Sequence, residues 1–230
     1  MSESVSPVIC LDGPSGVGKG TICLAVAGHL GWHILDSGSL YRITALQASR
    51  QFSNLELTAV DEIQLAEIAK NLSVSYGQEN GELVIYLDAE DITQLIRTVE
   101  IGNKASQIAV LPALRSALLA RQRAFLQPPG LVADGRDMGT VVFPDAVLKI
   151  YLTASAEERA QRRYKQLKDK GIDVILASLV EDLRLRDERD MNRQTAPLKP
   201  ASDAIIIDTT TLNIEQVTDE VMRWVQQRVS

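Results

Sequence analysis

The sequence is poor in the residues that disulfide scaffolds and structural metal sites need. Among its 230 residues are only two cysteines, Cys10 and Cys23, and two histidines, His29 and His33. Two thiols cannot build a disulfide framework, and both lie in apolar or helical patterns, so we expect them to be buried and reduced. Neither histidine stands at ligand spacing from a cysteine or carboxylate cluster. The sequence therefore predicts no protein-built metal site.

Long apolar runs and an excess of basic charge are also missing. No stretch approaches the roughly 20 apolar residues that cross a bilayer, and the polar residues 1–7 lack the basic and apolar parts of a signal peptide. The net charge is −6, which disfavours nucleic-acid binding because phosphate backbones require a broad basic surface. We expect a cytoplasmic protein with no membrane or nucleic-acid partner, in which local groups of arginines still bind small anions.

Short apolar runs alternate with helical patterns over most of the chain. An apolar share of 45% suits a single domain that spans residues 1–230. Strands are predicted at 8–12, 33–36, 131–134, 147–152 and 204–207. Helices are predicted at 19–30, 40–51, 98–127, 155–170, 174–193 and 214–229, with Pro112 opening a second helix inside 98–127. The alternation predicts an α/β fold with an open parallel sheet flanked by helices.

One part of the chain departs from this pattern. Residues 72–76 and 83–87 alternate apolar and polar side chains on either side of Glu79, Asn80 and Gly81. Asn-Gly between two alternating runs is typical of a β-hairpin. We therefore predict a small antiparallel insert at roughly 60–95.

A glycine-rich segment between the first strand and the first helix predicts a phosphate site of the P-loop NTPase type. Its residues are Gly13, Pro14, Ser15, Gly16, Val17, Gly18, Lys19, Gly20 and Thr21. Glycines let the backbone wrap so that its N–H groups face phosphate oxygens, and the helix N-terminus adds its dipole. The lysine then bridges the β- and γ-phosphates of ATP.

The residues around the lysine narrow the class of nucleotide-binding protein. Lys19 is followed by Gly20, and the hydroxyl comes only at Thr21, so we expect Mg²⁺ to be held mainly by nucleotide phosphates and water. No Asn-Lys-x-Asp motif for reading guanine is present, which disfavours a GTPase. The order Gly-Lys-Gly-Thr is typical of nucleoside monophosphate kinases.

Two later strand ends predict a second anion site. Ser37 follows the second predicted strand, with Arg42 one helical turn further on. Another apolar run ends in Asp134, Arg136 and Asp137, at the sheet edge where ligands bind in open α/β folds. A plain helix cap at the first strand end and a solvated charged turn at the second are the alternatives.

Arginines also recur on the two late charged helices. Arg159, Arg162 and Arg163 have the spacing of one helix face. Arg186, Asp190 and Arg193 have the spacing of another, at i, i+4 and i+7. A solvated charged face explains either set, but together they offer partners for several phosphates. We expect the segment 154–171 to be a lid, with Arg163 reaching the reacting phosphates.

Transfer between two phosphates explains why such residues are needed. Two unit charges of like sign 4 Å apart repel by about 4 kcal/mol at an effective dielectric constant of 20. Cationic groups must offset that repulsion, and no general base is needed because the attacking phosphate oxygen is already mostly ionised. The predicted catalytic set is Lys19, Arg136, Arg163 and Arg193.

Taken together, the motifs resemble bacterial cytidylate kinases, which are CMP and dCMP kinases, along nearly the full chain. The matching segments are 13–21, 36–38, 105–107, 134–140 and 189–193. The resemblance implies that ATP phosphorylates CMP and dCMP to the diphosphates, releasing ADP, in pyrimidine nucleotide metabolism. It also implies that the antiparallel insert belongs to the acceptor-binding part.

The resemblance assigns roles residue by residue. It implies that the phosphate of CMP is held by Ser37, Arg42, Arg136 and Arg193. It implies that cytosine is read by Ser106, Arg115 and Asp137, and that the ribose is held by Arg186 and Asp190. A carboxylate at position 137 suits the exocyclic amino group of cytosine, whereas uracil would turn an acceptor toward it.

Two other functions stay open at this level. Another P-loop kinase, acting on UMP, AMP or a shikimate-like acid, would keep the first site and change the second. A P-loop regulatory module would bind ATP without turning over any acceptor. We expect a monomer, because nothing in the sequence demands an oligomer.

Overall fold

The computed structural model describes residues 6–79, 82–169 and 171–229, and a five-stranded parallel sheet lies at its centre. In spatial order the strands are β2 (His33–Asp36), β6 (Leu131–Gly135), β1 (Val8–Asp12), β7 (Leu148–Thr153) and β8 (Ile205–Asp208). All pair in parallel register. The five predicted strands and the parallel sheet are therefore confirmed.

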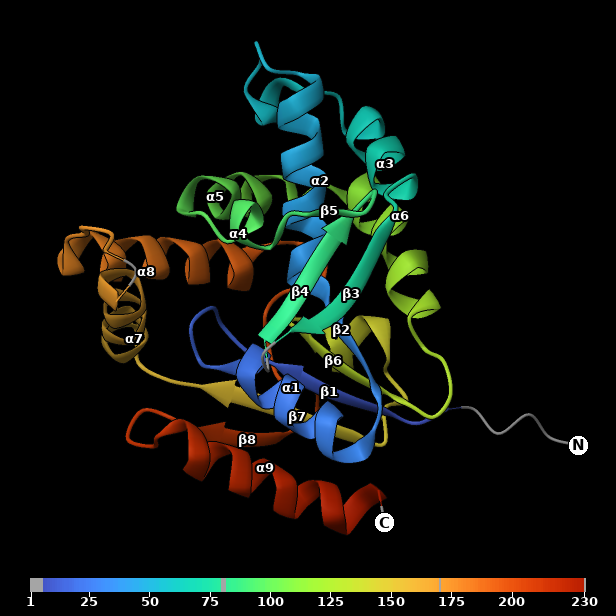
Figure 1. Ribbon diagram of the computed structural model, residues 1–230, viewed down its shortest axis with the longest axis vertical. Helices are drawn as coiled ribbons and strands as arrows, with labels where there is room; N and C mark the ends of the chain where they lie inside the picture. The colour runs from blue at the N-terminus through green and yellow to red at the C-terminus, as the bar shows by residue number, and fades with distance from the viewer. Residues whose placement is uncertain (1–5, 80–81, 170, 230) are drawn as a thin grey trace, which may run out of the picture.

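Helices cover both faces of this sheet (Figure 1). On one face lie α1 (Lys19–Leu30) and α9 (Ile214–Val229). On the other lie α2 (Ser37–Gln51) and α6 (Pro112–Ala124). Two more helices extend the same core away from the sheet: α3 (Glu62–Lys70) packs on α6, and α5 (Val99–Ile108) packs on α2. Alternate residues of β1 pack into the two apolar cores, one on each face of the sheet. Ile9 and Leu11 belong to the core beneath α1 and α9, and Val8 and Cys10 belong to the core on the other face. A strand buried on both faces reads as a continuous apolar run, which is why the sequence reveals it.

The predicted hairpin is present as part of a second, antiparallel sheet. Its strands are β3 (Val74–Glu79), β4 (Glu82–Leu87) and β5 (Glu90–Asp91), followed by the short α4 (Thr93–Ile96). Asn80 and Gly81, on which the turn was predicted, lie outside the described residues. Ile85 and Ile92 of this part pack with Ile43 of α2 in one cluster. The insert therefore rests on the helix that starts at the second predicted anion site.

The sequence analysis did not predict α3, the short helix η1 (Leu57–Ala59) or α4. The carboxylate of Asp61 caps α3 by accepting the N–H of Ile63 at 2.7 Å. Leu65, Ala66 and Ala69 of α3 belong to the main core on the face of α6, so the antiparallel sheet occupies only the later part of the span 60–95.

Some helix boundaries differ from the predicted ones. α2 begins at Ser37 rather than at residue 40, because the carboxylate of Asp36 accepts the N–H of Ser39 at 3.0 Å and starts the helix there. The pattern at 98–127 forms two helices divided at Pro112, as predicted. The second of them ends at Ala124, three residues early.

Two charged helices project from one side of the molecule (Figure 1). They are α7 (Ala156–Asp169) and α8 (Leu176–Asn192), and both were predicted. They pack on each other through a small apolar cluster that contains Ala160, Leu167 and Leu179. This pair is held by its own core and by the polar contacts described below.

Candidate active site

The glycine-rich segment forms a tight loop between β1 and α1. Three of its glycines have positive φ angles, of 147° at Gly13, 87° at Gly16 and 94° at Gly18. A Cβ atom at Gly13 would lie 2.1 Å from the main-chain oxygen of Leu152, so no other residue fits there. Helix α1 starts within this segment, at Lys19. The loop therefore has the backbone geometry by which N–H groups face a phosphate.

Lys19 lies inside this loop, beside a carboxylate. Its Nζ donates to the main-chain oxygens of Gly13 and Pro14, each at 2.9 Å, and lies 3.8 Å from Oδ1 of Asp134. Burial lowers the pKa of Lys19, and Asp134 opposes that shift. Burial raises the pKa of Asp134 to about 7, with Lys19 acting in the opposite direction. Asp134, predicted to bind substrate, thus stands at the P-loop and not in the second pocket.

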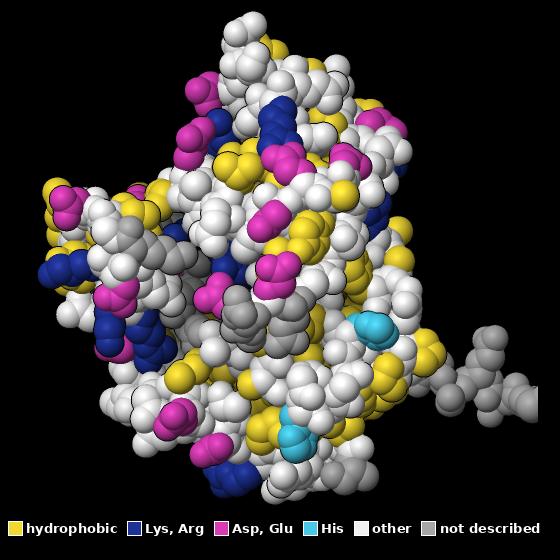
Figure 2. Space-filling model, in the orientation of Figure 1, with side chains coloured by type: hydrophobic (Ala, Val, Ile, Leu, Met, Phe, Trp, Pro, Cys, Tyr) yellow, Lys and Arg dark blue, Asp and Glu magenta, His cyan; other side chains and the backbone are white. Residues whose placement is uncertain are grey.

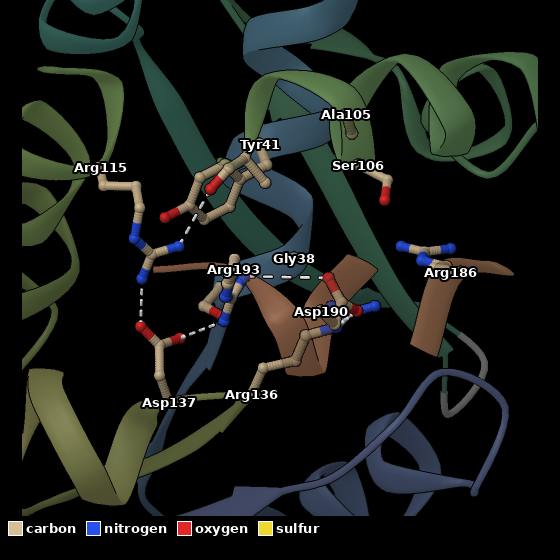
Figure 3. A pocket seen from close by; sticks show the side chains of 12 residues that line it. Gly38, Tyr41, Ala105, Ser106, Arg115, Arg136, Asp137, Arg186, Asp190 and Arg193 are labelled. Carbon is tan, nitrogen blue, oxygen red and sulfur yellow. Dashed lines mark hydrogen bonds and ion pairs between the residues drawn. The ribbon is translucent and has the colours of Figure 1, made fainter. Parts of the chain in front are cut away.

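A second pocket opens next to the P-loop, and it contains most of the predicted acceptor residues (Figure 3). They come from α2, α5, α6, α8 and the turn after β6. The predicted residues that line it are Ser37, Ser106, Arg115, Arg136, Asp137, Arg186, Asp190 and Arg193. Residues more than 150 positions apart, such as Ser37 and Arg193, therefore line one pocket.

Ion pairs connect the charged side chains of this pocket. Arg115 pairs with Asp137, and Arg136 pairs with Asp190. Arg193 lies between the two aspartates, 3.9 Å from Asp137 and 3.8 Å from Asp190. Four arginines face two aspartates in the lining, so the pocket has an excess of positive charge. Such a field favours an anionic ligand.

Three buried polar atoms of the pocket have no hydrogen-bond partner among the described residues. They are Oγ of Ser106, Nε of Arg186 and Nη2 of Arg193. Figure 3 shows Ser106 and Arg186 close together at one side of the pocket, with no dashed line from either. Burial, followed by the charge of Arg136, lowers the pKa of Arg186 to about 9. Since buried polar groups are normally paired, these atoms mark where a polar ligand would be stabilised.

Two predicted arginines lie outside the pocket lining. Nη1 of Arg42 donates to the main-chain oxygen of Ile96 at 2.6 Å, and burial lowers the pKa of Arg42 to about 10. Nη2 of Arg163 donates to the main-chain oxygen of Arg97 at 3.2 Å. Figure 2 shows Lys and Arg side chains in the hollow between the α7–α8 projection and the rest of the molecule.

The arginines predicted to share one face of α7 contact different partners. Arg159 pairs with Asp187 of α8, and its Nη1 donates to the main-chain oxygen of Ser15 at 3.0 Å. Arg162 instead donates to Thr209 Oγ1 at 3.2 Å. Tertiary neighbours therefore separate side chains that the helical spacing groups together.

Sequence reasoning missed Tyr41, which also lines the second pocket. The guanidinium carbon of Arg115 lies 5.9 Å from the centroid of the Tyr41 ring, within the range of a cation–π contact. Tyr41 is one helical turn after Ser37 on α2, and that i, i+4 spacing could have indicated it. The small residues Gly38, Ala105 and Ala109 complete the lining.

In the described part of the chain, no helix is both long and apolar enough to cross a membrane. Within the same residues, no three His, Cys, Asp or Glu side chains gather as a metal site would require.

Comparison with known proteins agrees with this geometry. A model of the cytidylate kinase family matches residues 9–227. The chain belongs to the cytidylate kinase family. The predicted family is confirmed, and so is the prediction that the chain is an enzyme, an ATP-dependent kinase.

Several curated cytidylate kinases are similar over nearly their whole length. The cytidylate kinase of Stutzerimonas stutzeri (strain A1501) is 56% identical over 224 residues, covering 96% of each chain. That of Aeromonas salmonicida (strain A449) is 52% identical, covering 98% of this chain and 96% of the relative. That of Shigella sonnei (strain Ss046) is 50% identical, covering 99% and 98%.

Proposed function

We propose that the protein transfers the terminal phosphoryl group of MgATP to CMP, and also to dCMP, giving ADP and CDP or dCDP. The observation that carries this proposal is the second pocket, which has an excess of arginine. There, buried polar atoms of Ser106, Arg186 and Arg193 have no hydrogen-bond partner among the residues that the structure describes. Membership of the cytidylate kinase family identifies the ligand class that would satisfy them.

The donor half is the glycine-rich loop. Its main-chain N–H groups and the N-terminus of α1 would hold the phosphates of MgATP, and Lys19 would exchange its two carbonyl partners for phosphate oxygens. Mg²⁺ enters with the nucleotide and is held mainly by phosphates and water. Asp134 is the carboxylate beside Lys19, and it would be the residue to contact the ion or its water, since Mg²⁺ is usually bound through one or two carboxylates.

The acceptor half divides into a phosphate part and a nucleoside part. Ser37 at the start of α2, Arg136 and Arg193 would hold the phosphate of CMP. The resemblance adds Arg42, which lies outside the lining but whose charge acts on the pKa of Arg186. Arg186 and Asp190 of α8 would hold the ribose. Each assignment follows the resemblance and is supported by the place of the side chain in or beside one pocket.

The cytosine would be read by Ser106, Arg115 and Asp137. The carboxylate of Asp137 would accept from the exocyclic amino group, while Arg115 and Ser106 donate to the ring's acceptors. The Arg115–Asp137 pair is buried, so it fixes both groups before the base arrives. Uracil would place an acceptor against the carboxylate and leave buried groups unpaired, which lowers its use.

The transfer itself requires charge compensation and exclusion of water. Lys19, Arg136, Arg163 and Arg193 would stabilise the charge on the transferring group. Arg163 is half-buried and donates to the main-chain oxygen of Arg97, and burial lowers the pKa of Arg163. An approaching phosphate would therefore stabilise the charged form of Arg163. We assign the lid role to the segment 154–171, because a closed lid excludes water as a competing acceptor.

Three further properties belong to the same proposal. The chain acts as a monomer, because nothing in the sequence demands an oligomer. It works in the cytoplasm, where the free thiols of Cys10 and Cys23 stay reduced. Its acidic net charge of −6 disfavours a nucleic-acid partner.

The binding role of the pocket can be tested with two arginines of α8. Arg186→Ala should raise the KM for CMP about tenfold or more, because a buried guanidinium with a free donor is removed. Arg189 of the same helix lies outside the pocket lining, and its Nε donates to the main-chain oxygen of Leu185, so Arg189→Ala is the matched control. Equal CMP KM values in the two variants would contradict the acceptor site.

A further inference from the structure

Asp12 connects the two phosphate sites of the molecule. It is the last residue of β1, the central strand, and the P-loop begins at the next residue. Its Oδ1 accepts the N–H of Met138 at 2.9 Å, and its Oδ2 accepts the N–H of Gly139 at 2.8 Å. Both oxygens of one buried carboxylate are therefore bound to a segment more than 120 residues away.

The segment held by Asp12 directly follows two acceptor-pocket residues. Met138 and Gly139 open the short π-helical turn η2 (Met138–Val142), and Arg136 and Asp137 come immediately before it. The side chain of Asp137 does not cap η2, so the carboxylate of Asp12 supplies the acceptors for the first N–H groups of that turn. The position of the turn thus depends on a side chain from β1.

Close packing leaves this turn little room to move. A Cβ atom at Gly139 would lie 3.0 Å from Cδ of Lys149 and 3.4 Å from Oδ2 of Asp12. Lys149 is itself buried and paired with Asp203, at 2.9 Å. The main chain at Gly139 is therefore confined between the carboxylate on one side and a fixed lysine side chain on the other.

Stability alone does not account for a carboxylate at this place. Asp12 is 5% exposed, and it takes part in no ion pair among the described residues. Burial raises the pKa of Asp12 to about 6, although the two main-chain hydrogen bonds oppose that shift. The desolvation of this buried charge therefore offsets part of what its two hydrogen bonds contribute to stability.

We propose that Asp12 is a positioning residue that fixes Arg136 and Asp137 relative to the P-loop. It touches neither substrate, and it acts through the main chain of Met138 and Gly139. The inference rests on the proposed function, because Arg136 is there assigned to the phosphate of CMP and Asp137 to the cytosine. Loss of the carboxylate should therefore disturb acceptor use and base selectivity while leaving the ATP phosphates held.

The test compares Asp12→Asn and Asp12→Ser with wild type. The asparagine variant places an amide N–H₂ against one of the two main-chain donors, and the serine variant offers a single, shorter acceptor. Asp61→Ala is the matched control, because it also removes a carboxylate that accepts a main-chain N–H, at α3 and away from the pocket. The KM values for CMP and ATP, and kcat/KM for CMP and UMP, are measured for each, together with the melting temperature.

In both Asp12 variants the KM for CMP should rise about tenfold, and the preference for CMP over UMP should fall about tenfold. The KM of the Asp12 variants for ATP should change less than about twofold. The control Asp61→Ala should lower the melting temperature about as much as the Asp12 variants do, but keep the wild-type preference for CMP over UMP. The serine variant decides the matter if the asparagine variant does not fold.

Two outcomes separate the inference from the function on which it rests. If wild type itself does not prefer CMP, the proposed function fails. If wild type prefers CMP but the Asp12 variants lose CMP and UMP turnover in equal proportion, Asp12 contributes only to folding and the positioning role is overturned.

Discussion

Arg159 of α7 donates a hydrogen bond from Nη1 to the main-chain oxygen of Ser15 in the P-loop, at 3.0 Å. The same guanidinium pairs with Asp187 of α8 and is only 3% exposed. One buried side chain therefore joins the donor loop to both helices that carry the proposed lid and ribose residues. The projection in Figure 1 is tied to the nucleotide site by this contact.

Removing the partner of Arg159 should destabilise the protein strongly. Asp187→Ala leaves a buried guanidinium without its carboxylate, and such losses cost about 3–5 kcal/mol of unfolding free energy. The double variant Arg159→Met, Asp187→Leu should recover part of this loss, because no buried charge remains. Chemical denaturation measures both values.

An exposed ion pair between the same two helices supplies the control. Arg184 pairs with Glu157, and both side chains are largely exposed. Glu157→Ala should change the unfolding free energy far less than Asp187→Ala does. If Glu157→Ala and Asp187→Ala lose similar amounts of unfolding free energy, the buried contact between Arg159 and the P-loop adds no stability beyond that of an exposed ion pair.

Arg162 and Arg163 are neighbours in sequence, but we expect loss of Arg163 to lower turnover and loss of Arg162 to lower stability. Arg163→Ala should lower kcat about a hundredfold, because it removes the cation that we propose to act on the transferring group, at a stability cost of about 1 kcal/mol or less. Arg162→Ala should destabilise by about 1–3 kcal/mol, because its guanidinium bonds Thr209 and the main-chain oxygen of Leu212. Its effect on kcat should be smaller. Unchanged turnover in Arg163→Ala would remove the lid assignment.

Asp137→Asn should reduce the preference for CMP over UMP at least tenfold, as a rough lower bound. The substitution removes the charge that pairs with Arg115 and places a donor beside the amino group of cytosine. Asp145→Asn, at an exposed position shortly after η2, is the control and should leave the ratio unchanged. The ratio of kcat/KM for the two nucleotides is the measurement, and a wild-type ratio in Asp137→Asn would refute this account of selectivity.

Asp134 should make the stability of the nucleotide-free protein depend on pH. Its pKa is raised by burial from 3.8 to about 7, so between these values the folded chain binds a proton that the unfolded chain has released. The contribution of Asp134 is therefore fully present below about pH 4 and is lost as the pH rises through about 7.

The comparison with Asp134→Asn isolates this contribution. The difference in unfolding free energy, wild type minus variant, should fall between pH 4 and pH 8. Asp12, whose pKa is also raised, is present in both proteins, so the part of its contribution that does not depend on Asp134 cancels. A difference that stays constant or grows with pH would contradict a buried carboxylate at this position.

The sequence predicted the fold where a local pattern determines the local structure. Central strands such as β1 and β6 are apolar because helices cover both faces, and the P-loop glycines are required by positive φ angles. The short elements α3 and β5 escaped prediction. α3 uses small residues such as Ala66 and Ala69 to pack, and β5 has only two residues.

Most of the residues that line the second pocket could be named from the sequence, but the contacts that they make could not. Strand-end arginines could be grouped, yet nothing local indicates that Arg42 would donate to Ile96 while Arg193 enters the pocket. Asp12 gives the clearest case, because an aspartate before a glycine reads as the end of a strand. Its hydrogen-bond partners lie 126 and 127 positions along the chain, and only the fold brings them to it.

The most direct test of the whole account is ADP release from MgATP with CMP, dCMP, UMP, AMP, GMP and shikimate offered as separate acceptors. We expect fast turnover with CMP and dCMP, weak turnover with UMP and none with the others. Fast turnover with AMP, GMP or shikimate, or ATP binding without turnover of any acceptor, would contradict the assignment of the second pocket to CMP.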